Sequence, residues 1–224
     1  MTTEGSMGHE GPPDMKRVVI IPPPEVPEGG KEYHSPEGAQ TEKHRIDNAA
    51  GLPIYELNRH FRDANRKEVA SSSQQSHSYD PDNRRTESIT QTLKDHPKGV
   101  SQTRETSIYN GNERDPALIR GEIEAGPDQG HKYEKRIRKA AVTRDGQTLG
   151  TLEMETTDFI AQGNNPGKPR EGDQATCVKY IDAGGNFLGH RGVNEKGESY
   201  TWQAKPDVPL PPEGEWEKLA GIAA

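Results

Sequence analysis

Residues 133–157, YEKRIRKAAVTRDGQTLGTLEMETT, carry the signals of two strands joined by a tight turn. The centre of this stretch, Asp145-Gly146, favours a tight two-residue turn between antiparallel strands. After that turn, apolar and acidic side chains alternate from Leu152 to Glu155, which is the period-2 pattern of a half-buried strand. The sequence therefore predicts a β-hairpin within residues 128–165, with basic side chains of its first strand facing glutamates of its second.

Three further strands are predicted beyond this hairpin, within residues 170–205. Turn-forming Gly and Asn residues separate the runs Thr176–Ile181, Phe187–Val193 and Glu198–Gln203. The expected aromatic core of this meander consists of Tyr180, Phe187, Tyr200 and Trp202. The hairpin and the meander together predict a small antiparallel β-rich module over residues 128–205.

The rest of the chain contains little apolar material. Only 33 of the 224 residues are Leu, Ile, Val or Phe, below the level of about 20% at which disorder is favoured. Ordering each residue costs about 1–2 kcal/mol of backbone entropy, which burial of apolar surface has to offset. We therefore expect a mainly irregular, extended chain with a small antiparallel β-rich C-terminal module and one or two short helices.

The segments outside the module are predicted as follows. Residues 1–53, rich in Pro and Gly, form an extended arm, and residues 54–70 form an amphipathic helix. Residues 71–127 form a polar, intrinsically disordered linker or strap with a short helix over 116–124. Residues 206–224 form a Pro-rich tail with a weak terminal helix.

Two apolar groups in the N-terminal half are expected to contact a partner. The helix over 54–70 would carry a stripe of Ile54, Leu57 and Phe61 between polar flanks. The arm contains the run Val18-Val19-Ile20-Ile21, which could add a strand to the sheet edge of another protein. The predicted partner is a larger protein assembly.

Known catalytic signatures are absent from the sequence, and no cofactor or small-molecule substrate is indicated. None of the eight histidines pairs with another at the i,i+3 or i,i+4 spacing of a helical metal site, so no metal site is predicted. The single cysteine, Cys177, is expected to be an ordinary core or edge residue. A hydrolytic alternative would use His190 as general base and Arg191 as anion clamp, with His131 as a further candidate.

The candidates for contact with nucleic acid are Arg59, Arg62 and Arg66 of the predicted helix and the densest basic run of the chain. This run consists of Lys132, Lys135, Arg136, Arg138 and Lys139. Glu134 interrupts the run and acidic strands follow it, which favours a charge-paired hairpin. The formal net charge is −7, so nucleic acid is an unlikely main partner.

These observations favour a non-enzymatic structural or interaction protein that drapes over a larger assembly, such as a virus particle, and stabilises it. The alternatives are a small secreted or delivered effector enzyme and a nucleic-acid-binding accessory protein. No signal peptide or transmembrane segment is recognisable, because the longest aliphatic run, Val18–Ile21, ends at three prolines. We therefore expect a soluble protein in the cytoplasm or in an assembled particle, without membrane insertion.

Overall fold

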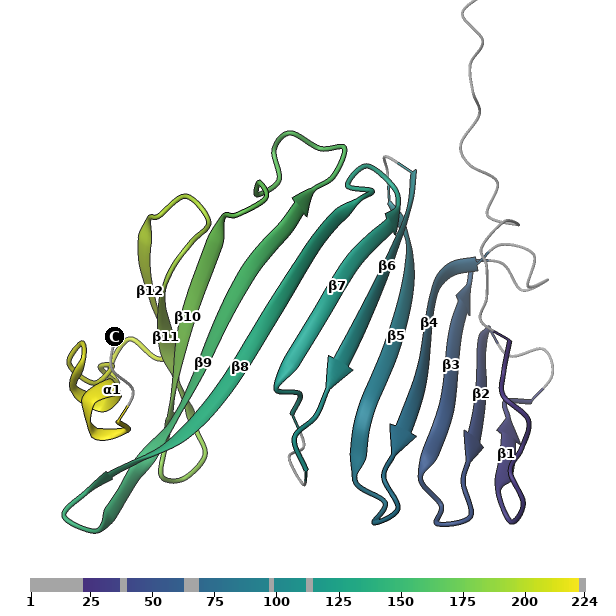
Figure 1. Cartoon of the computed structure of the whole chain (residues 1–224), viewed down its shortest axis with the longest axis horizontal. Coiled ribbons are helices and arrows are strands. Elements are labelled where there is room, and N and C mark those ends of the chain that lie inside the picture. Colours follow the sequence, from purple (N-terminus) through teal and green to yellow (C-terminus); the bar gives the residue numbers. More distant parts are fainter. Residues whose placement is uncertain (1–21, 37–39, 63–68, 97–98, 112–114, 222–224) are drawn as a thin grey trace, which may run out of the picture.

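A computed structural model describes residues 22–36, 40–62, 69–96, 99–111 and 115–221 of the chain. These residues form one antiparallel sheet, whose twelve strands follow one another in space in the order of the sequence. Figure 1 shows a single twisted layer that runs from β1 at one end to β12 at the other. Each inner strand therefore pairs with the strands directly before and after it in the chain, as in an up-and-down meander.

The strands differ widely in length, and β8 and β9 are the longest. The elements are β1 (Lys31–His34), β2 (Thr41–Asp47), β3 (Pro53–Phe61), β4 (Val69–Tyr79), β5 (Arg85–His96), β6 (Gly99–Ile108), β7 (Leu118–Ala125), β8 (His131–Arg144), β9 (Gln147–Gln162), β10 (Gln174–Asp182), β11 (Phe187–Val193), β12 (Ser199–Gln203) and α1 (Glu215–Leu219).

Four of the connections between strands share one hydrogen-bond pattern. In each, the side-chain Oδ1 of an Asn or Asp accepts a hydrogen bond from the backbone N–H four residues later. The residue three positions after it has a positive φ, which Gly and Asn adopt at low cost. The first residues of these turns are Asn48, Asp80, Asp182 and Asn194. The turns reverse the chain after β2, β4, β10 and β11.

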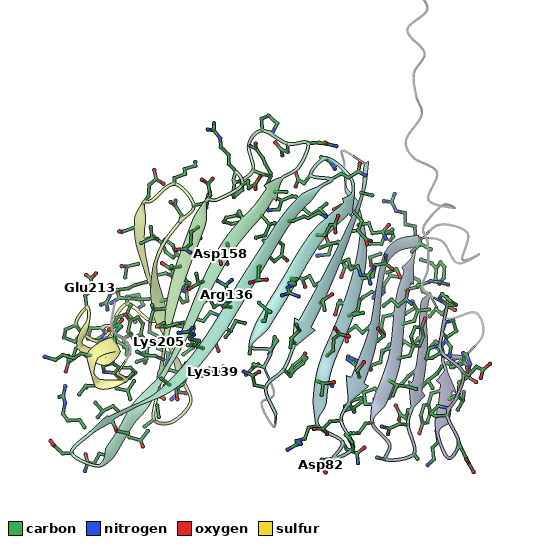
Figure 2. All side chains as sticks on the ribbon, viewed as in Figure 1. Asp82, Arg136, Lys139, Asp158, Lys205 and Glu213 are labelled. Atoms are coloured by element: carbon green, nitrogen blue, oxygen red, sulfur yellow. The ribbon has the colours of Figure 1, made fainter. Side chains whose placement is uncertain are left out.

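Most of the buried apolar side chains gather in two clusters, one toward each end of the sheet. The larger cluster joins β8, β9 and β10 to the C-terminal segment, where Trp216 of α1 packs against Leu152 and Tyr180. The smaller cluster lies on β2 and β3, around Ile46 and Tyr55. Most side chains of the strands between these clusters are polar, as Figure 2 shows along the sheet.

The hairpin predicted from residues 133–157 is confirmed. Strands β8 and β9 pair in antiparallel register around Asp145 and Gly146, whose φ angles of 51° and 79° give the expected tight turn. Lys139 lies directly opposite Glu153, whereas Arg136 and Arg138 point to the other face of the hairpin. The predicted meander is also confirmed as β10, β11 and β12, and a short terminal helix is present as α1.

The predicted amphipathic helix over residues 54–70 is wrong. Residues 53–61 form β3, in which Tyr55, Leu57 and Phe61 are buried at even spacing along the strand. Over so short a segment, the spacing of the apolar residues fits both the 3.6-residue period of a helix and the two-residue period of a strand. The segment forms a strand because it pairs with β2 on one side and β4 on the other. The short helix predicted over 116–124 is also wrong, because β7 occupies Leu118–Ala125.

The overall fold class was predicted wrongly as well. The chain is not mainly irregular with a small β-rich module, since the described residues form one sheet that continues through the predicted arm and linker. Extended, intrinsically disordered segments are therefore the wrong description for residues 71–127, which contribute β4 to β7. The error arises because a one-layer sheet satisfies its backbone groups through the ladder and needs little apolar core.

Among the described residues, no helix is long and apolar enough to cross a membrane.

Candidate functional site

Four aromatic side chains lie together on β11 and β12, at the β12 end of the sheet. The ring centroid of Trp202 lies 5.7 Å from Phe187 and 5.5 Å from His190, with near-parallel planes in both pairs. Tyr200 meets the His190 ring edge-on at 5.6 Å. Phe187, Tyr200 and Trp202 remain 41%, 38% and 49% exposed. We call Phe187, His190, Tyr200 and Trp202 the aromatic cluster.

The register of the strands places this cluster on one face. Trp202 lies opposite His190, and His190 lies opposite Lys179 on β10. Lys179 lies opposite Glu153 of β9 and donates hydrogen bonds to both Glu153, at 2.8 Å, and Glu155. Although burial alone would raise the pKa of Glu153, the hydrogen bonds from Lys179 and Lys139 lower it. The aromatic cluster therefore lies next to a group of ion-paired Lys and Glu side chains on β8, β9 and β10.

The outer side of β12 carries unpaired backbone groups, because no described strand lies beyond it. The N–H of Asn194 donates to the carbonyl of Glu198, and the N–H of Ala204 donates to that of Leu188. In an antiparallel pair, hydrogen-bonded positions alternate with positions whose backbone groups point away. The even-numbered residues of β12 therefore bond to β11, and Ser199, Thr201 and Gln203 direct their N–H and C=O groups to the open edge.

Cys177 lies beneath Tyr200 at the end of this cluster. Partial burial raises the pKa of the Cys177 thiol. The pKa of Tyr200 is raised to about 12 by partial burial and by its interaction with Cys177. The thiol is therefore kept protonated near neutral pH, which does not suit a nucleophile.

The structure separates the three residues of the hydrolytic alternative. His190 and Arg191 are neighbours on β11 and so project from opposite faces of the sheet. Arg191 lies over the Tyr180 ring, 5.2 Å from its centroid, and donates a hydrogen bond to its Oη at 3.2 Å. His131 is buried at the far end of β8, against Phe159.

The distance between His131 and His190 follows from the register. His131 lies opposite Gln162 of β9. His190 lies opposite Lys179 of β10, which in turn lies opposite Glu153 of β9. These positions on β9 are nine residues apart, which is about 30 Å along a strand. The two histidines therefore do not share a site.

The basic run of β8 is divided between the two faces and paired with acidic side chains. Lys132 pairs with Glu122 at 3.0 Å, and Lys135 pairs with Glu155 at 3.6 Å. Arg136 lies 2.6 Å from Asp158, a pair labelled in Figure 2, and Lys139 lies 2.9 Å from Glu153. Arg138 is exposed on the same face as Arg136. This arrangement offers no continuous positive surface along the hairpin.

The residues expected to contact a partner lie elsewhere in the molecule. Leu57 and Phe61 are buried in β3, and Ile54 is half-buried against the cluster around Tyr55. The run Val18–Ile21 lies outside the described residues.

A buried chain of hydrogen bonds crosses β3, β4 and β5. His77 Nδ1 lies 2.8 Å from Ser88 Oγ, and His77 Nε2 lies 3.3 Å from Glu56 Oε2. A hydroxyl, an imidazole and a carboxylate in series can activate a nucleophile. However, Ser88 is only 4% exposed, so a substrate has no access to its hydroxyl in this conformation. The arrangement is suited to joining three strands rather than to catalysis.

A hollow of about 430 Å³ lies over β6, β7 and β8. Its charged lining is largely paired, since Arg120 lies 2.9 Å from Glu134 and Lys132 lies 3.0 Å from Glu122. Neutralised walls give this hollow no strong preference for a charged ligand.

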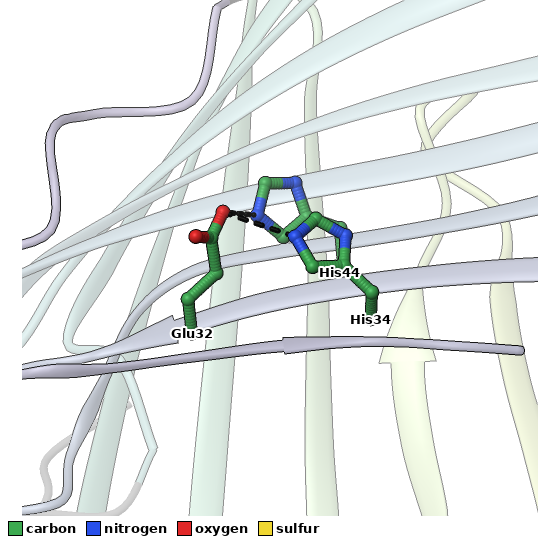
Figure 3. Close-up of side chains that lie close together, drawn as sticks. All are labelled: Glu32, His34 and His44. Atoms are coloured by element: carbon green, nitrogen blue, oxygen red, sulfur yellow. Dashed lines mark hydrogen bonds and ion pairs between the residues drawn. The ribbon is translucent and has the colours of Figure 1, made fainter.

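The described residues include one group that could hold a metal ion: Glu32, His34 and His44. Figure 3 shows both imidazoles directed at the Glu32 carboxylate, with Nε2 of His44 and of His34 at 2.8 and 3.1 Å from Oε1. The two rings stack with centroids 4.2 Å apart. The hydrogen bond with His44 lowers the pKa of Glu32, against the opposing effect of burial, and the hydrogen bond with His34 lowers it further.

This group was not predicted, because its members do not lie at the i,i+3 or i,i+4 spacing of a helical metal site. On a strand, Glu32 and His34 share a face at i,i+2, and the β1–β2 register places His44 opposite His34. The alternation Glu-x-His in a hairpin was the available signal.

The comparisons with known proteins give no relative: no protein-family model matches the chain, and neither a curated protein nor a solved structure does.

Proposed function

We propose that this chain is a non-enzymatic interaction protein, in which the sheet is a scaffold and β12 with its aromatic cluster is the docking surface. The observation that carries this proposal is the exposure of three large aromatic rings on an open edge strand. The partner is a protein within a larger assembly, and it contributes an extended segment that pairs with β12.

The aromatic cluster supports this proposal through its exposure. Rings left in water lose the favourable free energy that their burial would supply. Tryptophan and tyrosine dominate the binding energy of many protein interfaces, because they bury a large area at a small cost in side-chain entropy. Trp202, the most exposed ring of the cluster, is therefore the expected centre of the interface.

The open edge of β12 supports the same mode of binding. Outward N–H and C=O groups at Ser199, Thr201 and Gln203 can form a new ladder with an added strand, as in β-augmentation. Side chains of the added strand would then lie beside Tyr200 and Trp202 on one face. The ladder supplies affinity, and the rings select apolar side chains on alternate residues of the partner.

Photo-crosslinking in the native source tests this proposal. A photoreactive residue at Gln203 should form a discrete adduct with a partner protein, whereas one at Lys31 on the opposite edge should not form that adduct. Thr201→Pro should abolish the Gln203 adduct, because proline removes an outward N–H and leaves the inward ladder intact. Thr201→Ala keeps the N–H and is the matched control.

A second variant tests the contribution of the aromatic rings to partner binding separately from that of the backbone edge. Trp202→Ala should weaken partner binding on the order of 10-fold or more. Tyr33→Ala removes an aromatic ring of similar exposure from the opposite edge and should change nothing. An adduct at Gln203 that survives both Thr201→Pro and Trp202→Ala would refute the docking surface.

A further inference from the structure

We propose that Glu32, His34 and His44 form a zinc site that fastens edge strand β1 to the rest of the sheet. The three side chains place one ligand atom each within 4.8 Å of the others. Two come from β1 and one from β2, so a bound ion would bridge the two strands. The site lies at the opposite end of the sheet from the aromatic cluster and is independent of the proposed docking function.

The separations of both histidine nitrogens from the Glu32 carboxylate are close to the ligand spacing of a zinc site. Tetrahedral Zn²⁺ with bonds of about 2.0–2.1 Å holds its ligand atoms about 3.3–3.4 Å apart. Glu32 Oε1 lies 2.8 Å from His44 Nε2 and 3.1 Å from His34 Nε2. Lengthening each of these two separations by a few tenths of an ångström would bring it to the tetrahedral spacing.

The site combines one fixed ligand with two adjustable ones. The His44 side chain is 10% exposed, and its ring packs edge-on against the buried Tyr55. The side chains of Glu32 and His34 are 41% and 61% exposed, so they have room to move. The His34 ring has to tilt out of its stack with His44 for both lone pairs to converge on one ion.

The donor set selects the class of metal. Two imidazole nitrogens and one carboxylate oxygen suit Zn²⁺, whereas Ca²⁺ and Mg²⁺ prefer oxygen ligands throughout. Three protein ligands leave the fourth tetrahedral position for water. The coordination would replace the hydrogen bonds that now join these side chains and would hold β1, whose residues are all exposed.

Isothermal titration calorimetry of the chelator-treated full-length chain with zinc chloride measures the affinity of the site for Zn²⁺. The unaltered chain should bind Zn²⁺ with micromolar or tighter affinity. Glu32→Gln and His34→Gln, both at exposed positions that tolerate substitution, should each weaken that binding at least about 10-fold. Glu28→Gln and His60→Gln are matched controls outside the site and should leave the affinity unchanged.

Hydrogen exchange supplies a second readout, independent of affinity. Zinc should slow exchange of the β1 amides in the unaltered chain and in the two control variants, and should have no such effect in His34→Gln. The proposal is overturned if the unaltered chain does not bind zinc, if Glu32→Gln and His34→Gln bind it as tightly as the controls do, or if zinc leaves β1 exchange unchanged.

Discussion

Three tyrosines lie across a glycine of the neighbouring strand. Tyr133 is opposite Gly121, Tyr180 is opposite Gly189, and Tyr200 is opposite Gly192. A Cβ atom on Gly121 would lie 2.1 Å from the Tyr133 ring. Gly121 and Gly192 thus leave space that the opposite tyrosine side chain fills, a pairing that fixes strand register in sheets.

A double-mutant cycle tests this pairing. Gly121→Ala should destabilise the chain by about 1–3 kcal/mol, because the new methyl group collides with the Tyr133 ring. The three atoms closest to that methyl group all belong to the Tyr133 side chain. In the Tyr133→Ala background the same change should therefore cost much less, as measured by urea unfolding. Equal costs in both backgrounds would show that the ring does not lie over the glycine.

The buried His77 makes stability depend on pH. Burial lowers the pKa of His77, and Arg85 lowers it further, against the opposing effect of Glu56. As the pH falls below about 6.5, the unfolded chain takes up a proton that the folded chain does not, so the free energy of unfolding decreases. The contribution is fully present above that pH and is lost as the pH falls through the folded-state pKa.

Urea unfolding between about pH 7.5 and pH 5 measures this effect. His77→Gln should reduce the loss of stability at the acidic end, relative to the loss in the unaltered chain. His190→Gln, which alters a histidine of the aromatic cluster, should keep the full loss. An identical pH profile for His77→Gln and the unaltered chain would contradict the burial of a neutral imidazole.

At the scale of elements, the four related turns have a sequence signature of Asn or Asp followed three positions later by Gly or Asn. Gly197 has a φ of 79°, and no heavy atom lies within 4 Å of the place a Cβ would take. Gly197→Ala should therefore cost about 1–2 kcal/mol through backbone conformation alone. Lys196→Ala, one position earlier, should cost much less. Equal thermal midpoints for the two variants would contradict this turn geometry.

The same turns explain which elements the sequence could predict. The turns that begin at Asp182 and Asn194 were recognised from their glycines, and the strands beside them were predicted nearly at their observed limits. The turn that begins at Asp80 has Asn83 in place of glycine, and it lies within a polar stretch without apolar alternation. Strands β4 and β5 therefore gave no signal in hydrophobic periodicity.

The two candidate sites also differ in how much of each could be predicted from the sequence. Tyr200 and Trp202 were recognised as members of an aromatic group on strands, but a core position was expected for them. Their exposure depends on β12 being the last described strand, which the local sequence does not specify. The Glu32, His34 and His44 group requires the β1–β2 register, and the prediction of an extended arm left no hairpin in which to test it.

At the scale of the whole molecule, polar strands connect two separate apolar clusters. Between the cluster around Tyr55 and the cluster around Leu152, strands β4, β5 and β6 contain mainly Ser, Thr, Gln and charged residues. Exposed ion pairs contribute only about 0–1 kcal/mol each. The central strands are therefore ordered mainly by the continuous backbone ladder, which ties them to packed strands on both sides.

Amide hydrogen exchange of the isolated full-length chain shows whether the backbone ladder continues through the central strands. Backbone amides of β4, β5 and β6 bonded within the ladder should exchange far more slowly than in an unfolded chain. Protection confined to β8 through β12, with unfolded-like exchange throughout β4 to β6, would contradict the continuous twelve-stranded sheet.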